Sequence, residues 1–190
     1  LRPQRSDSVF PEFDPAIHVA PFESAHDSGA VTWLAGMDFG FRDPTVVLWA
    51  FLDHTSGMLR IIDERIESQR TLDTHISALR YPRSHLRIPT WIACDPAGHQ
   101  RSDQTGKSAI DALRHAGLTA ISSFKPIDIG LRAIRRRLAP ASGPTTLCIH
   151  PRCRALIEAL QSYHYPSHDL RSLIPVKDGP DHAIDALRYL

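Results

Sequence analysis

The order of the apolar segments is the feature that most limits how this chain can fold. Three short apolar segments come first, over residues 32–38, 45–52 and 58–66, and a polar turn at 53–57 separates the last two. After them, segments with helical spacing alternate with short extended ones, at 90–95, 119–123 and 145–149. Consecutive strands followed by such alternation predict an α/β fold, in which a mixed β-sheet carries helices on both faces.

Five helices are predicted in the second part of that pattern. One follows Thr71, and one runs from the capping pair Ser108 and Asp111 to Gly117. The others cover the stripes at 131–138 and 156–163 and the last ten residues. The predicted order is therefore β-β-β-α-β-α-β-α-β-α-α.

The first 30 residues differ in composition from the rest. They show weak periodicity and hold several turn-forming residues, namely Pro3, Pro11, Pro15, Pro21 and Gly29. We therefore expect residues 1–30 to be a linker or an arm that contributes no core, and residues 31–190 to form one domain. The first residue is Leu rather than Met, so we expect the chain to be a fragment of a longer protein.

Composition excludes few classes of function. The formal net charge of +1 says little about partners, although arginines cluster at 80–87 and 132–137. The 3 cysteines, an odd number without a signal peptide, point to reduced thiols inside a cell. No apolar run approaches the ~20 residues of a transmembrane helix.

Acidic side chains interrupt the apolar terminal segment. In a helix, Asp181 and Asp185 lie four residues apart, and His182 lies three residues before Asp185, so all three can share one face. Burial of a carboxylate is costly unless a cation or hydrogen-bond donors compensate it. This segment therefore needs a reason for its acids.

Two further acids end apolar strands elsewhere. Asp38 ends the first predicted strand and Asp95 the fourth. If these two strands pair in parallel, their carboxyl ends lie side by side, where open α/β sheets place their ligands. Asp38 and Asp95, together with Asp185 of the terminal helix, then predict a divalent-metal site.

Each of these acids also has a simpler interpretation. A single Asp after a strand is more often a turn or cap residue than a ligand. Asp43 precedes Pro44 and is interpreted as part of a turn, and Asp181 is either the cap of the terminal helix or a ligand. His182 is either a packed core histidine or part of the site. The remaining acids near the third strand are expected to face solvent or form salt bridges: Asp63, Glu64 and Glu67.

Two other motifs suggest sites that their spacing does not support. Cys148, His150 and Cys153 suggest zinc, but a structural zinc site normally needs four ligands, so we favour a strand end and a helix start. The segment 106–108 is similar to the end of a phosphate-binding loop, yet Arg101 occupies the position where that loop requires glycine. We therefore expect no ATP site.

Four segments together resemble a known family. They are residues 36–40 (GMDFG), 93–98 (ACDPAG), 125–138 and, most specifically, 182–189 (HAIDALRY). In this order they resemble the ribonuclease H-like superfamily, and within it the nuclease domain of the terminase large subunit of tailed bacteriophages. Residues 9–13 (VFPEF) also look like the segment that leads out of the terminase motor domain.

The resemblance implies a fold, an activity and a metal site. The fold would be ribonuclease H-like, and the activity would be hydrolysis of phosphodiester bonds in concatemeric double-stranded DNA. Asp38, Asp95 and Asp185 would be the catalytic acids and would bind two Mg²⁺ or Mn²⁺ ions, with His182 and Asp181 as further candidate ligands. Hard oxygen ligands suit such ions, which in two-metal sites serve both the attacking and the leaving oxygen.

The resemblance also implies partners. The full protein would contain an ATPase motor domain, act with a portal and a small terminase subunit, and work in the cytoplasm of the host bacterium, as a phage or prophage protein. Candidate DNA contacts are Lys107 and the helix arginines Arg132, Arg135 and Arg136, although a charge run is more often a solvated face. The alternatives are another nuclease of the superfamily, of resolvase or integrase type, and a non-catalytic DNA-binding or docking domain.

Overall fold

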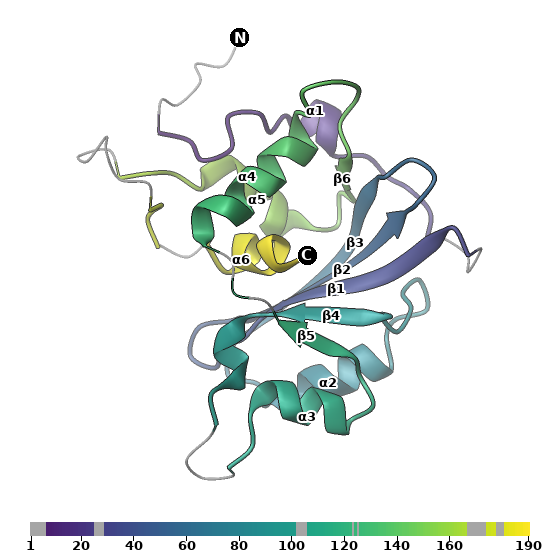
Figure 1. Cartoon of the computed structure of the whole chain (residues 1–190), viewed down its shortest axis with the longest axis vertical. Helices are drawn as coiled ribbons and strands as arrows, with labels where there is room; N and C mark the ends of the chain where they lie inside the picture. The colour runs from purple at the N-terminus through teal and green to yellow at the C-terminus, as the bar shows by residue number, and fades with distance from the viewer. Residues whose placement is uncertain are drawn as a thin grey trace.

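One mixed sheet of six strands forms the centre of the protein, in the order β5-β4-β1-β2-β3-β6 (Figure 1). The computed structural model describes residues 7–24, 29–101, 106–122, 124, 126–166, 174–177 and 181–190. The strands are β1 (Val31–Asp38), β2 (Thr45–Asp53), β3 (Leu59–Glu67), β4 (Trp91–Cys94), β5 (Ala120–Ser122) and β6 (Leu147–Ile149).

The pairing of the strands confirms the prediction on which the site depends. β1, β2 and β3 form an antiparallel meander, whereas β4 pairs with β1 in parallel. Met37 lies opposite Cys94 in that parallel register, so Asp38 and Asp95 each come directly after a paired residue. Parallel pairing also joins β5 to β4 and β6 to β3.

Helices cover both faces of the sheet. They are α1 (Pro15–His18), α2 (Leu72–Arg80), the 3₁₀ helix η1 (Pro96–His99), α3 (Ala109–His115), α4 (Ile127–Leu138), α5 (Arg154–Ser162) and α6 (Asp181–Tyr189). In Figure 1, α2 and α3 lie on one side of the sheet and α4, α5 and α6 on the other. The predicted fold class is confirmed. Within the described residues, no helix is long and apolar enough to cross a membrane.

Alternation along β1 explains why both faces are covered. Leu34 packs into the cluster that includes the apolar sides of α4, α5 and α6. Trp33, Ala35 and Met37 point the other way, into the cluster with α2 and α3. Because neither face of β1 meets water, the strand is apolar almost throughout and reads as one continuous run rather than as an alternating pattern.

Side-chain hydrogen bonds fix the starts of two helices, α3 and α5. The Ser108 hydroxyl accepts the backbone N–H of Asp111 at 3.1 Å, which confirms the predicted cap of α3. The carboxylate of Glu64 accepts the backbone N–H groups of Ala155 and Leu156 at 2.8 and 3.0 Å, so an acid of β3 caps α5 from across the fold. The predicted helix 156–163 is thus held at its start by the sheet.

The expectation that residues 1–30 contribute no core is wrong for Val9 and Phe10. Both are buried, at 0% and 2% exposure. The Val9 N–H donates to the carbonyl of Tyr163 at 3.0 Å, and the short α1 follows. Prolines at 11 and 15 remove the periodicity by which a core segment is normally detected, but they do not prevent burial. Whether the segment links to a motor domain stays a prediction.

Candidate metal centre

The terminal helix reaches the sheet at a glycine. Gly36 of β1 has no side chain, and α6 passes directly over it, so the helix packs closely against the strand. This contact brings the start and middle of α6 toward Asp38, two residues further along β1. The strand end and the helix are thereby held together although they are distant in sequence.

Asp38 is the best-defined member of the predicted site. It is the last residue of β1 and is 5% exposed, and its Oδ2 lies 3.0 Å from Nδ1 of His182 on α6. The pKa of Asp38 is raised to about 6, mainly by burial; the hydrogen bond with His182 opposes the rise, and the negative charges of Asp185 and Asp95 contribute to it. These influences show that Asp95, Asp185 and His182 all lie within electrostatic reach of Asp38.

Asp95 and Asp185 are each held by one carboxylate oxygen. Oδ1 of Asp95 accepts the backbone N–H of Ala97 at 2.9 Å, at the start of η1. Oδ1 of Asp185 accepts from Nε of Arg188 at 2.9 Å, and the Arg188 side chain is only 8% exposed. Among the residues that the structure describes, the second oxygen of Asp38, Asp95 and Asp185 has no hydrogen-bond partner.

This donor set fits a hard divalent cation in its chemistry. Three carboxylates come from three elements, and each offers an oxygen that the protein does not use. The described residues do not, however, include any group of three His, Cys, Asp or Glu side chains already gathered closely enough to hold a metal ion. The carboxylates are therefore near one another but not convergent.

Comparison with known proteins shows which proteins this chain is similar to. No protein-family model matches the chain. The terminase large subunit of Escherichia phage T5 is 23% identical over 189 residues, which are 95% of this chain and 40% of that protein. The large terminase of a thermophilic bacteriophage, solved in complex with ADP, superposes with a TM-score of 0.78 at 19% identity, over 96% of this chain and 44% of that one.

Some solved structures correspond to nearly the same length of chain as this one. The large terminase nuclease domain of bacteriophage SPP1, with bound Mn, has a TM-score of 0.59 at 18% identity, over 90% of this chain and 94% of that one. The chain has the fold of a phage terminase nuclease domain. It spans less than half the length of the complete terminase large subunits that it resembles.

Two further candidate ligands, His182 and Asp181, keep more than one possible role. His182 touches Asp38 and is partly exposed, so it lies beside Asp38 rather than within the apolar core, and its role as a ligand stays a prediction. Asp181 lies in the first turn of α6 and is 5% exposed, and its charge acts on Tyr163 of the α5 end. Asp43, predicted as a turn residue, is exposed.

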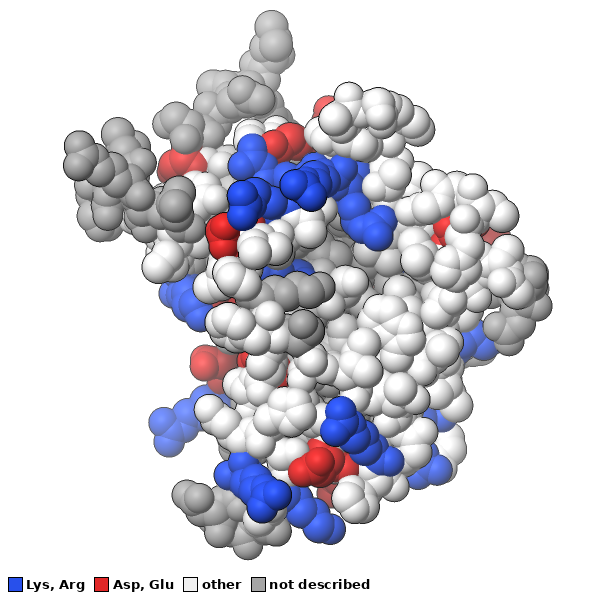
Figure 2. Space-filling model, in the orientation of Figure 1, with Lys and Arg blue, Asp and Glu red and all other residues white. Residues whose placement is uncertain are grey.

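The predicted DNA contacts of the terminase-type fold separate into three groups. Arg132 pairs with Asp128 at 2.7 Å, and Nε of Arg135 donates to Glu12 at 2.8 Å, so both guanidinium groups already have protein partners. Arg136 is exposed and forms no ion pair within the described part of the chain. We call Arg132, Arg135 and Arg136 the arginine band of α4; Figure 2 shows Lys and Arg side chains gathered over this helix.

Lys107 lies apart from that band, on the loop before α3. It is exposed and lines a hollow with Arg101 and His115, beside η1. The neighbouring residues 102–105 lie outside the described residues, as do Ser123 of the predicted fifth strand and Lys125 of the third resemblance segment. Whether any of these cations binds DNA stays a prediction.

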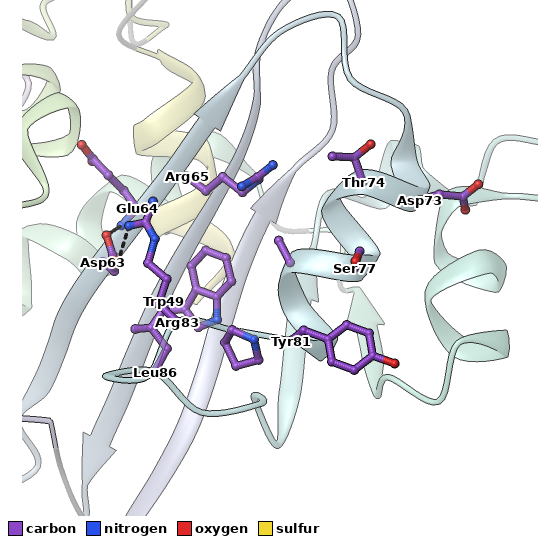
Figure 3. Close-up of a pocket in the computed structure, with 12 residues that line it drawn as sticks. Trp49, Asp63, Glu64, Arg65, Asp73, Thr74, Ser77, Tyr81, Arg83 and Leu86 are labelled. Carbon is purple, nitrogen blue, oxygen red and sulfur yellow. Dashed lines mark hydrogen bonds and ion pairs between the residues drawn. The ribbon is translucent and has the colours of Figure 1, made fainter.

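A separate cavity lies on the face of the sheet opposite to α6. It measures about 620 Å³ and lies between β3 and α2 (Figure 3). Asp63 in its wall is buried, and its Oδ2 is 3.0 Å from Arg83 and 2.8 Å from His85. The expectation of a salt-bridged acid is confirmed for Asp63. The prediction that Glu64 faces solvent or forms a salt bridge is wrong, because its carboxylate caps α5.

The zinc interpretation finds no support in the terminase-type fold. Cys148 lies within β6 and Cys153 directly before α5, where its buried thiol faces the carbonyl of Ile61. Burial raises the pKa of Cys153 above its ordinary value. A thiol in such surroundings is a structural residue.

Arg188 is a residue of the centre to which the sequence analysis assigns no role, although it lies within the resemblance motif. In the structure it holds Asp185, and its guanidinium group lies over the ring of Tyr189 at 4.6 Å. The spacing of three residues between Asp185 and Arg188 in a helix is the sequence signal that predicts this pair.

Proposed function

We propose that this chain is the nuclease domain of a phage DNA-packaging terminase large subunit and that it hydrolyses phosphodiester bonds of double-stranded DNA with divalent metal ions. The observation that carries the proposal is the set of three carboxylates, Asp38, Asp95 and Asp185, each with one oxygen held by the protein and one left over. The terminase-type fold and the Mn bound to the SPP1 nuclease domain support it.

The residues of the site would divide the work. Asp38, Asp95 and Asp185 would hold Mg²⁺ or Mn²⁺, and two such ions would supply positive charge for the attacking water and the leaving oxygen. His182 positions Asp38, and Arg188 positions Asp185. The backbone N–H of Ala97 fixes the carboxylate of Asp95 at the start of η1.

The wider role is proposed from the relatives. Because the chain corresponds to 40% of the T5 large subunit, we propose that the complete protein also contains an ATPase motor domain, in keeping with the ADP bound to the large terminase of the thermophilic bacteriophage. We propose further that it acts with a portal and a small terminase subunit on concatemeric DNA in the host bacterial cytoplasm. Residues 7–24 would lie at the junction with the motor.

A plasmid assay tests the proposed activity. Supercoiled plasmid incubated with the chain and Mn²⁺ or Mg²⁺ should become nicked and linear, and excess chelator should stop the conversion. Asp185→Asn should remove cleavage, because it replaces a charged ligand by a neutral amide of the same size. Glu158→Gln, which removes the charge of an exposed acid on α5 away from the site, is the matched control and should cut normally.

The same assay separates the alternatives. A chain that binds plasmid but cuts it with neither metal would be a non-catalytic DNA-binding or docking domain. Cleavage that survives excess chelator or Asp185→Asn would contradict the metal-dependent mechanism. Melting temperatures of both variants establish that loss of cleavage is not loss of fold.

A further inference from the structure

A large hollow opens directly beside Asp95. It measures about 920 Å³ and lies between the turn after β4, the start of α4 and the end of α6. Apart from Asp95 itself, most of its wall is apolar or aromatic: Pro96, Ala97, Phe124, Pro126, Ile127 and Tyr189. The hollow is therefore continuous with the proposed metal site.

Phe124 is the unusual member of this wall. Its side chain is 82% exposed, more than any other large hydrophobic side chain of the described residues. A phenyl ring gains free energy when both of its faces are covered, and it prefers stacked or edge contacts with another flat ring. An exposed ring that lines a hollow at a candidate active site therefore fits a flat, apolar ligand surface.

A second hollow continues from the first with a different character. It measures about 950 Å³ and shares Ala97 and Gln100 with the first, so the two meet across η1. Its charged lining consists of Arg101, Lys107 and His115 against the single acid Asp73. Figure 2 shows Lys and Arg side chains also over the end of the molecule that carries α2 and α3.

An apolar hollow and a cationic hollow on the two sides of η1, the helix that begins directly after Asp95, match the bases and the phosphate backbone of a nucleic-acid strand. Cationic grooves follow the phosphate backbone, whereas aromatic side chains stack on bases. Inside a duplex the face of each base is covered by its neighbours, and only edges are exposed in the grooves. A ring that stacks on a base next to the cut site needs that base to be unpaired.

We propose that the hollow at Phe124 takes an unpaired base of the strand to be cut, and that the domain therefore prefers DNA that is locally unpaired at the cut site. The proposal rests on the proposed function. The base stacks on Phe124 beside Asp95, and the phosphates on the other side of η1 lie over Arg101 and Lys107. His99, fixed by a 2.7 Å hydrogen bond with Ser122, lies at the polar edge of the same hollow.

The test compares two oligonucleotide duplexes of equal sequence on the labelled strand. One is fully paired, and the other carries a short central mismatch with 2-aminopurine at the unpaired position. Binding is measured by anisotropy and 2-aminopurine fluorescence in chelator, so that no hydrolysis occurs. Cleavage with Mn²⁺ is measured separately on the same pair. The variants are Phe124→Ala, Phe124→Trp and the control Tyr81→Ala, which removes a ring that is 72% exposed outside both hollows.

The wild-type chain should bind and cut the mismatched duplex better than the paired one. Phe124→Ala should weaken binding of the mismatched duplex by about 5- to 150-fold, the loss expected for one base–aromatic stack, and should leave the paired duplex nearly unchanged. Phe124→Trp should bind the mismatched duplex about as tightly as the wild type does. Tyr81→Ala should change the binding of neither duplex. Because the side chain of Phe124 is largely exposed, its replacement removes little packing, and the variants should have the melting temperature of the wild type.

Two outcomes would overturn the base site. In one, Phe124→Ala binds the mismatched duplex as well as the wild type does. In the other, it loses the same factor on both duplexes. If plasmid cleavage with Mn²⁺ persists beside either outcome, the proposed nuclease function stands while the base site fails. If Phe124 governs binding in chelator but no metal supports cleavage, the base site stands and the nuclease proposal fails.

Discussion

Gly36 of β1 and Ala186 of α6 touch through their backbones: a Cβ atom at Gly36 would lie 2.1 Å from the carbonyl oxygen of Ala186 and 2.9 Å from Cγ of Leu190. The neighbour is helix backbone, which cannot rotate away as a side chain can. The distance between β1 and the helix that carries Asp185 and His182 is thus fixed by the absence of one methyl group.

Gly36→Ala should therefore push α6 away from the sheet. We expect the free energy of unfolding to fall by about 3 kcal/mol or more, at or beyond the upper end for overpacking a core, and cleavage to fall with it. Urea unfolding and the plasmid assay measure the two effects. Gly57→Asn, in an open hairpin turn with φ of 67°, is the control and should change neither. A stable, fully active Gly36→Ala variant would mean that α6 does not rest on β1 as described.

Asp38→Asn should stabilise the metal-free protein in a pH-dependent way. The pKa of Asp38 is about 6 in the folded chain and 3.8 ordinarily. Between these two pH values the folded state therefore keeps a proton that the unfolded state has already lost. Stability therefore falls as the pH rises from about 4 to 6, by about 3 kcal/mol at most. Asn carries no such charge, so the gain in melting temperature over the wild type, measured in chelator, should be larger at pH 8 than at pH 4.5. An equal gain at both pH values would contradict the buried acid cluster.

His75 should make the domain sensitive to mild acid. It is 1% exposed, neither ring nitrogen has a hydrogen-bond partner within the described residues, and burial lowers its pKa below the ordinary 6.5. The unfolded chain takes up a proton below about pH 6.5 that the folded chain resists, so stability falls as the pH falls. His75→Phe should reduce the loss of melting temperature between pH 7 and pH 5. The exposed His54→Phe should keep the wild-type loss.

The arginines of α4 should differ in effect. Arg136→Ala should weaken DNA binding, and it should lower the salt dependence by about one phosphate contact, because this arginine is exposed without an ion pair in the described chain. Arg135→Ala should cost about 1 kcal/mol of stability, because it leaves Glu12 without the cation that Nε and an amino nitrogen of Arg135 supply. Titration of labelled duplex at several salt concentrations, with urea unfolding beside it, distinguishes them. Identical behaviour of the two variants would mean that the arginines of α4 form a solvent-exposed face that does not contact DNA.

The sequence is sufficient to predict the sheet and the adjacent positions of Asp38 and Asp95. Apolar runs in β1 and β4 are buried on both faces, so they stand out as strands, and both end at an acid. Once these two strands pair in parallel, as the structure shows, their carboxyl ends place Asp38 and Asp95 side by side, where open α/β sheets bind ligands. The terminal motif adds Asp185 and His182 because its helical spacing places both on one face.

Contacts between distant segments account for what the sequence does not predict. Glu12 holds Arg135 across 123 residues, so the charge run on α4 looks free in the sequence although it is not. Val9 and Phe10 are buried, although the segment to which they belong shows no periodicity from which burial could be predicted. The hollow at Phe124 arises from three elements, and an exposed aromatic cannot be told from a buried one by composition.

His182 and Asp38 are 144 residues apart in sequence. Closing so long a loop costs conformational entropy, so we expect this contact to form late, after the strands between the two residues have paired. The acids would then stay apart during most of folding, while the sheet that carries them is still forming. Activity would appear only in the last step, together with full protection of the α6 amides from hydrogen exchange.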